Sequence, residues 1–178
     1  MRSNIVVVGG YGKVGRIVCE KLAKTYPSKV FAAGRDQQKA EEFSKDMHFK
    51  VLPFSFDISL DEEPAWLSAA KVVVVCIDLI DDRFAKMCLE MGIHYVDITA
   101  NYNYIKKIMA LNKNLNYGTG VVSVGLAPGL TNLLALEAVK ANKAISAIDI
   151  SVMLGIGEKH GPAAVEWTLE KNGLCFYK

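Results

Sequence analysis

Short apolar runs alternate with segments in which apolar residues recur every three or four positions, up to about residue 125. The runs are typical of buried parallel strands, and the periodic segments are typical of amphipathic helices. Strands are predicted at residues 5–8, 30–33, 50–55, 72–77, 94–98 and 120–124. Helices are predicted at residues 12–26, 36–47, 60–67, 81–91 and 101–115. Six strands that alternate with helices predict an α/β fold with a doubly wound parallel sheet of the Rossmann type.

The pattern changes after the sixth predicted strand. A turn at residues 125–129 precedes a predicted helix at 130–140, and strict alternation then predicts a half-buried antiparallel strand at 147–154. A glycine-rich loop at 155–161 and a helix at 162–171 follow. A single antiparallel strand cannot form its own sheet. We therefore expect its partner to come from another subunit or from a second domain that this chain contains only in part.

The turn between the first strand and the first helix contains the pattern G-x-G-x-x-G. In this position the pattern is typical of a dinucleotide-binding turn, although a glycine-rich turn that binds nothing is the alternative. Gly10 permits the tight turn, Gly12 lets a pyrophosphate reach the backbone, and Gly15 lets the helix pack close to the strand. The helix would direct its first N–H groups toward the phosphates. The predicted cofactor contacts are Gly10, Tyr11, Gly12, Lys13, Val14 and Gly15.

The end of the second strand, about 20 residues beyond the glycine motif, distinguishes NAD from NADP sites. An NAD site has an acidic side chain there for the ribose 2′-hydroxyl, whereas this strand ends in Ala33 and Gly34, followed by Arg35. A guanidinium can pair with a 2′-phosphate and stack on adenine, and Lys39 would add a second positive charge. The alternative for Arg35 is a solvated surface charge. Asp36 is interpreted as a helix N-cap or as a ribose contact. The pattern favours NADP over NAD.

Three more strand ends lie at the same edge of the predicted sheet. After the third strand, Asp57 is either a contact for the adenine amino group or part of an Asx turn or a cap. After the fourth strand the backbone should line the cofactor crevice, and Asp78 is more typical of a cap than of a catalyst. After the fifth strand, Thr99 either binds the nicotinamide carboxamide or caps the next helix. The candidate cofactor contacts here are Asp57, Ile58, Cys76, Ile77, Asp78 and Thr99.

The sequence contains few candidate catalytic residues. The three histidines are dispersed, no nucleophilic triad is recognisable, and no metal-ligand spacing is present. His160 lies in the glycine-flanked segment 157–161 beside a glutamate and a lysine. Such a cluster could recognise a carboxylate or relay a proton, and the alternative is a solvated turn. His160 is therefore the one catalytic candidate.

Composition narrows the class of protein. The net charge of the 178 residues is +2 with both signs spread along the chain, so no nucleic-acid partner is expected. The four cysteines have no C-x-x-C spacing and indicate reduced thiols. The first apolar run is too short for a signal peptide, and no run has the length of a membrane span. We expect a cytoplasmic protein that does not bind membranes.

Several segments in order resemble the saccharopine dehydrogenase-like family, also called saccharopine reductase. They are GGYGKVGR, AGRD, VVVCID, FAKMCLEMGIHYVDIT, GLAPGLTN and GEKHGPAAVEWTLE. The resemblance covers nearly the whole chain and implies a Rossmann domain that binds NAD(P), at residues 1–128. It also implies an α+β domain that binds substrate and dimerises, of which residues 129–178 would be the incomplete beginning.

The resemblance further implies a reaction. Members of the family form or cleave a secondary amine of an amino acid by hydride transfer, so the expected activity is that of an oxidoreductase on an amino-acid-like substrate. The sequence departs from many members, which carry Gly-Glu where Ala100 and Asn101 stand here, and the chain is about half their usual length. We therefore expect a cofactor-binding N-terminal part of a longer enzyme, inactive alone. A non-catalytic NADP sensor that acts through a partner is the alternative, and Arg35 argues against a methyltransferase.

Overall fold

The computed structural model describes residues 2–59, 64–111 and 118–153. By its internal contacts the chain divides into two units, Met1–Ser146 and Ala147–Lys178. Only residues 147–153 of the second unit are described. Within the described ranges no helix is both long and apolar enough to cross a membrane. The boundary between the predicted domains 1–128 and 129–178 stays a prediction.

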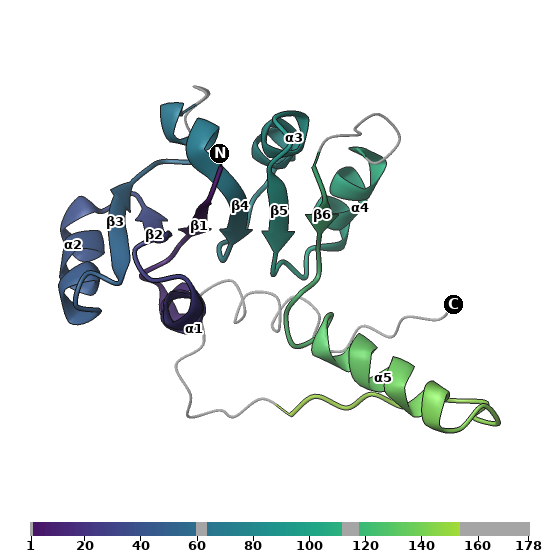
Figure 1. Ribbon diagram of the computed structural model, residues 1–178. Coiled ribbons are helices and arrows are strands. Elements are labelled where there is room, and N and C mark those ends of the chain that lie inside the picture. Colours follow the sequence, from purple (N-terminus) through teal and green to yellow (C-terminus); the bar gives the residue numbers. More distant parts are fainter. Residues whose placement is uncertain (1, 60–63, 112–117, 154–178) are drawn as a thin grey trace. The chain divides into compact units, whose positions relative to one another are not determined.

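The first unit contains a six-stranded parallel sheet, as predicted (Figure 1). The strand order is β3-β2-β1-β4-β5-β6, so the chain moves outward from β1 in one direction and then in the other. The strands are β1 (Asn4–Val8), β2 (Val30–Gly34), β3 (Val51–Ser55), β4 (Ala70–Val75), β5 (His94–Asp97) and β6 (Gly120–Val121). This reversal of direction between β1 and β4 leaves a crevice at the carboxyl edge of the sheet.

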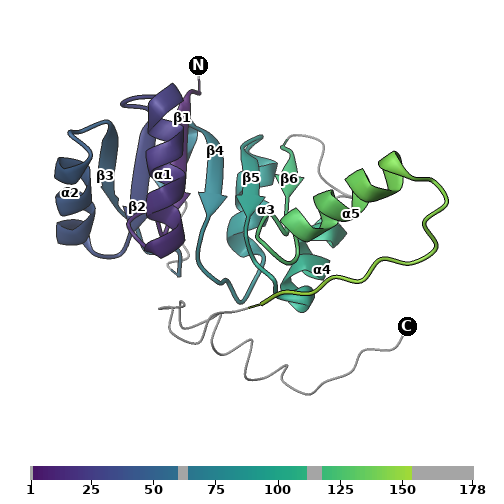
Figure 2. The same cartoon turned by 90° about the horizontal axis from the view of Figure 1, so that it is seen from below.

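Helices cover both faces of the sheet (Figure 1, Figure 2). Helices α1 (Lys13–Thr25) and α2 (Gln37–Asp46) bury Cys19 and Phe43 against Val7 of β1. The neighbouring Val6 and Val8 point to the opposite face, which packs against α3 (Arg83–Glu90) and α4 (Tyr102–Leu111). The 3₁₀ helix Ala65–Ala69 lies on that face as well. The unbroken apolar sequence of β1 is therefore explained by burial on both sides.

Two predicted strands differ from the structure by two or more residues at an end, whereas the other four agree to within one residue. Strand β4 starts and ends two residues before the predicted strand 72–77, because its last pairs are with Val8 of β1 and Asp97 of β5. Strand β6 is shorter than the predicted 120–124, since it pairs only with Tyr95 and Val96 of β5. Cys76 and the residues after it are thereby released from the sheet into the loop at its carboxyl edge.

Two predictions beyond the sheet have different outcomes. Helix α5 (Leu130–Ala141) is present where the helix 130–140 was expected, and none of its residues is buried. The predicted strand 147–154 is wrong for the described residues 147–153, which form no strand. The apolar positions Ile148, Ile150 and Val152 are between 41 and 55% exposed, since no partner strand in the described part of the chain pairs with them. The helix predicted at 162–171 lies outside the described residues.

The start of α1 is held very close to the turn after β1. Gly15 is buried, and a Cβ atom added to it would fall on the Gly9 carbonyl oxygen and lie 2.8 Å from the Gly10 Cα. Gly10 is equally confined, since its Cβ would lie 2.6 Å from the Ala32 Cα of β2. Gly9 adopts a positive φ of 75°, which glycine accepts without strain. These three glycines allow a backbone approach that no side chain would permit.

A buried polar network joins β5 to α4. The Tyr95 hydroxyl donates to Asp97 Oδ2 at 2.6 Å and lies 2.8 Å from the Tyr104 hydroxyl, and the Thr99 N–H donates to Asp97 Oδ1 at 2.7 Å. Asp97 is fully buried. Burial raises the pKa of its carboxyl group, although the hydrogen bonds from Tyr95 and Thr99 oppose that change. The network fixes the turn by which the chain leaves the sheet.

The close contact at Gly15 predicts a strong effect of one added methyl group. Gly15→Ala should lower the free energy of unfolding by about 1–3 kcal/mol, because the helix must move away from the turn. Gly12→Ala is the control, since Gly12 is exposed and its Cβ would meet only the Gly9 oxygen, at 3.0 Å. Urea unfolding followed by circular dichroism measures both. Equal stability of the two variants would contradict the packing argument.

The buried Asp97 predicts a pH dependence of stability. Because its pKa is higher in the folded state, the unfolded chain releases the proton first as pH rises. The contribution of Asp97 is therefore fully present at acid pH and is lost as pH rises through the folded-state pKa. Relative to Asp97→Asn, the wild-type protein should lose stability as pH rises above about 4, the ordinary pKa of an aspartate.

Urea unfolding at a series of pH values tests this expectation. Asp46→Asn is the control, because Asp46 ends α2 and its side chain is 64% exposed. A stability difference between wild type and Asp97→Asn that does not change with pH, or that grows in favour of wild type toward neutrality, would show that Asp97 is not destabilised by burial.

Candidate functional site

A pocket of about 650 Å³ lies at the carboxyl ends of β1 to β4. Its lining comes from the loops that follow these strands and from the start of α3. The lining residues are Val8, Gly9, Tyr11, Gly12, Gly34, Arg35, Phe56, Asp57, Ile58, Ser59, Cys76, Ile77, Asp78, Leu79, Ile80, Asp81, Arg83 and Phe84. The four strand ends converge there because parallel strands present the same end at the same edge.

Nine residues predicted to contact a cofactor line this pocket. They are Tyr11, Gly12, Gly34, Arg35, Asp57, Ile58, Cys76, Ile77 and Asp78. Six others do not line it: Gly10, Lys13, Val14, Gly15, Asp36 and Thr99. Lys13 and Val14 are exposed in the first turn of α1, beside the lining residue Gly12, whereas Gly10 and Gly15 support the turn from beneath. The catalytic candidate His160 lies outside the described residues.

The glycine turn forms one wall of the pocket. Its backbone is fixed by hydrogen bonds, since the Gly12 N–H donates to the Gly9 oxygen at 2.9 Å and the N–H groups of Gly9 and Gly10 donate to the Ala33 oxygen. Gly12 is the N-cap of α1 and offers no side chain. A bound phosphate could therefore approach the backbone and the N-terminus of α1, where helical N–H groups lack partners within the helix.

Asp36 is occupied by helix α2. Its Oδ1 accepts the Lys39 N–H at 3.1 Å, and its Oδ2 lies 3.1 Å from Lys39 Nζ. These contacts, the backbone hydrogen bond first, lower the pKa of the Asp36 carboxyl group. Asp36 has the capping geometry that the sequence suggested as one of its two roles. Arg35, by contrast, is exposed and lines the pocket.

Asp57, which follows β3, lines the pocket near Arg35. Its Oδ1 accepts the Ser59 N–H at 2.9 Å and the Ser59 hydroxyl at 2.7 Å, which is an Asx turn. These bonds lower the pKa of the Asp57 carboxyl group, and the positive charge of Arg35 adds to the effect. Asp57 therefore stays ionised and places a negative charge near Arg35.

The loop after β4 forms the opposite wall. The Cys76 N–H donates to the Val8 oxygen at 2.9 Å, which holds the loop beside the glycine turn. Burial raises the pKa of the Cys76 thiol to about 12, so this group is a poor nucleophile near neutral pH. The sequence argument missed Arg83, whose Nε lies 3.1 Å from Asp81 Oδ1 and which lines the pocket. Its position at the start of α3, the helix that follows β4, was the available signal.

Thr99 is only 2% exposed. Its hydroxyl oxygen accepts the Asn101 N–H at 3.1 Å, and its own N–H is bound to Asp97. This is an ST turn that precedes α4. The helix cap that the sequence suggested for Thr99 is instead made by Asn101, whose Oδ1 accepts the N–H groups of Asn103 and Tyr104 at 3.1 and 3.2 Å.

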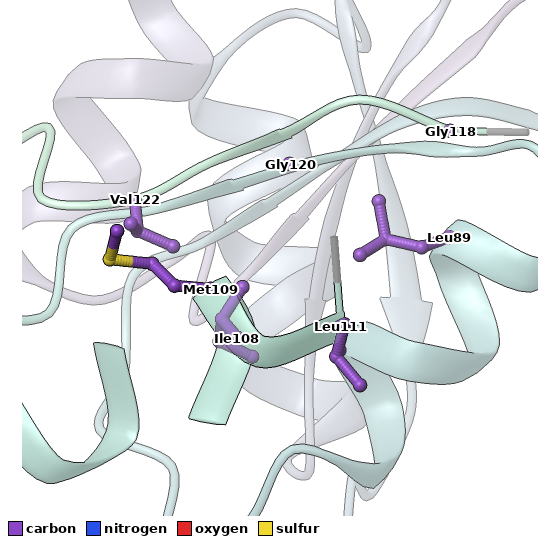
Figure 3. A pocket seen from close by; sticks show the side chains of 7 residues that line it. All are labelled: Leu89, Ile108, Met109, Leu111, Gly118, Gly120 and Val122. Carbon is purple, nitrogen blue, oxygen red and sulfur yellow. The ribbon is translucent and has the colours of Figure 1, made fainter. Parts of the chain in front are cut away.

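A second, smaller pocket of about 190 Å³ lies between α4, the end of α3 and the segment around β6 (Figure 3). Leu89, Ile108, Met109, Leu111 and Val122 line it together with Gly118 and Gly120. None of these side chains carries a charge or a strong hydrogen-bonding group. The larger pocket at the strand ends is therefore the candidate functional site.

Comparison with known proteins identifies the family. Residues 5–124 match the family described as the saccharopine dehydrogenase NADP binding domain. This range contains the sheet, helices α1 to α4 and the larger pocket. No curated protein sequence matches the chain.

One solved structure shows a similar fold, and others match more weakly. Apo saccharopine dehydrogenase (L-Glu forming) from Saccharomyces cerevisiae superposes with a TM-score of 0.54 at 18% identity, over 78% of this chain and 31% of that enzyme. This chain thus spans about a third of its length. 5-Ketofructose reductase of Gluconobacter sp. strain CHM43 has a TM-score of 0.46 at 14% identity, over 96% of this chain and 56% of that one.

GenD2 from gentamicin A biosynthesis, in complex with NAD, has a TM-score of 0.42 at 16% identity, over 67% of this chain and 34% of that one. The matched family is defined by a nicotinamide dinucleotide site, and the larger pocket lies where a Rossmann fold binds such a cofactor. By its sequence from residue 5 to residue 124, the chain belongs to the saccharopine dehydrogenase NADP-binding domain family.

Proposed function

We propose that the pocket at the strand ends binds NADP in preference to NAD. The observation that carries this proposal is the environment of Arg35 at the end of β2. Arg35 lines the pocket, whereas the neighbouring carboxylate of Asp36 is bound to Lys39. At the end of β2, a ribose 2′-hydroxyl would meet no carboxylate that lines the pocket, whereas a 2′-phosphate would meet the Arg35 guanidinium. The Asp57 carboxylate lines the pocket at the end of β3.

The remaining contacts follow from the same geometry. The exposed backbone at Gly12 and the start of α1 would hold the pyrophosphate. Asp57 and Ile58 would lie beside the adenine, while Cys76, Ile77 and Asp78 would line the path toward the nicotinamide. When bound, the cofactor supplies hydride transfer, and the protein supplies binding and orientation.

The wider activity is also proposed. The full enzyme would transfer a hydride at a C–N bond of an amino-acid-like substrate, act in the cytoplasm and form a homodimer through the domain that begins near residue 129. The family membership supports this activity. The alternative is a non-catalytic NADP sensor, and the exposed leucines of α5, Leu133 and Leu134 among them, are compatible with a partner.

Calorimetric titration of the chain with NADP and with NAD tests cofactor choice. Tighter binding of NADP supports the proposal, and equal or absent binding of both contradicts it. Transfer of hydride from labelled NADPH to the imine that an amino acid forms with a carbonyl compound, measured on the full enzyme, then separates an oxidoreductase from a sensor.

Removal of the Arg35 side chain should affect one cofactor selectively. We expect Arg35→Ala to weaken NADP binding by about 1–3 kcal/mol and to leave NAD binding nearly unchanged, because only NADP carries the 2′-phosphate. Lys24→Ala is the control, because this substitution also removes one positive charge, but from the last turn of α1. Equal loss of affinity for both cofactors in Arg35→Ala would exclude a 2′-phosphate contact.

Gly12→Ala should affect both cofactors instead. The added methyl group would stand between the pyrophosphate and the backbone, so we expect affinity for NADP and for NAD to fall about tenfold or more, which is at least about 1.4 kcal/mol. Stability should change little, because Gly12 has an ordinary φ of −74°. Unchanged affinity in a folded Gly12→Ala protein would place the pyrophosphate elsewhere.

A further inference from the structure

The Tyr11 side chain links the glycine turn after β1 to the residues that follow β2. It lies in the glycine turn after β1, yet its hydroxyl oxygen accepts the Asp36 N–H at 2.8 Å, beyond the end of β2. The Tyr11 ring also covers Gly34. A Cβ atom added to Gly34 would fall on the Tyr11 hydroxyl and lie 2.6 Å from Tyr11 Cζ and 2.7 Å from Cε1.

The two contacts lie on either side of Arg35. The ring of Tyr11 packs against the residue before Arg35, and its hydroxyl binds the backbone of the residue after it. Other bonds extend this support, since the Gly34 oxygen accepts the Phe56 N–H at 2.9 Å and Asp36 caps α2. The backbone that carries Arg35 is therefore fixed from both neighbours, while its side chain stays exposed in the pocket.

Two polar groups of Asp36, next to Arg35, have partners within the fold. The Asp36 N–H could otherwise donate to a ribose 2′-oxygen, but it is bound to Tyr11. The Asp36 carboxylate is bound to Lys39, and Asp36 does not line the pocket. Of the residues at the end of β2, Arg35 is the one whose charged group lines the pocket and could meet a substituent at the 2′ position.

We propose that Tyr11 is a positioning residue for cofactor specificity: by holding Gly34 and Asp36, it presents Arg35 to the 2′-phosphate of NADP. This inference rests on the proposed binding of NADP by the same pocket. It assigns to a residue of the glycine turn, which contacts pyrophosphate in this fold, an effect on the opposite end of the adenosine. It also explains why a glycine precedes Arg35, because any side chain at that position would displace the Tyr11 ring.

Tyr11→Phe tests the proposal, since it removes one oxygen and keeps the ring. We expect NADP to bind about threefold to tenfold more weakly, as for the loss of one hydrogen bond, while the affinity for NAD changes less than twofold. The same selectivity should appear for the fragments 2′,5′-ADP and 5′-AMP. Tyr26→Phe is the matched control, because Tyr26 is exposed at the opposite end of α1.

Coupling to Arg35 distinguishes positioning from a direct contact. In the Arg35→Ala background, Tyr11→Phe should cause no further loss of NADP affinity, because there is no guanidinium left to present. Additive losses, or equal loss for both cofactors, would overturn the inference. Failure of the wild-type chain to prefer NADP would instead overturn the proposed function itself, so the two failures are distinguishable.

Hydrogen exchange provides a readout that needs no cofactor. The Asp36 amide proton should exchange faster in Tyr11→Phe than in wild type, and the Tyr26→Phe protein should match wild type. Gly34→Ala is a second variant, which should displace the ring and reproduce the selective loss of NADP affinity. Unchanged exchange at Asp36 in Tyr11→Phe, or unchanged NADP preference in Gly34→Ala, would contradict the role of Tyr11.

Discussion

The contact between helix α1 and the turn after β1 is the constraint on which the rest of the site depends. At Gly15 the helix approaches the Gly9 carbonyl so closely that a single methyl group would not fit. This approach aims the N-terminus of α1 at the carboxyl edge of the sheet and leaves Gly12 exposed beside it. The proposed binding surface for phosphate groups therefore rests on backbone packing, before any side chain contributes.

Side chains then give the pocket its chemical character. Arg35 and Asp57 bring opposite charges to the ends of β2 and β3, and the Arg35 charge helps to keep Asp57 ionised. Asp36 lies next to Arg35 in sequence but belongs to α2, because its carboxylate satisfies the Lys39 N–H at the start of that helix. These two adjacent residues thus have separate roles, since Arg35 lines the pocket and Asp36 caps α2.

The carboxyl end of β5 is stabilised by buried side chains. There Asp97, Tyr95 and Tyr104 form a buried hydrogen-bonded network that holds the turn from β5 into α4. Such a network is stabilising only when every member has a partner, which restricts the shape of the turn. The pocket, by contrast, is lined mainly by the loops after β1 to β4.

Local patterns were enough to predict the six strands, the doubly wound sheet and the glycine turn, because apolar periodicity and glycine spacing report directly on burial and close packing. They were less reliable at strand ends: β4 ends at Val75 because its partners do, and residues 147–153 alternate in hydrophobicity yet form no strand. The sequence left two interpretations of Asp36, a helix cap and a ribose contact. Its hydrogen bond from the Lys39 N–H shows the geometry of a helix cap. The contact of Tyr11 with Asp36, like the burial of Thr99, joins residues through space and leaves no periodic trace. The sequence by itself thus determined the fold and the place of the pocket, whereas the tertiary structure decided which side chains face it, since that depends on contacts between strand ends that are distant in the chain.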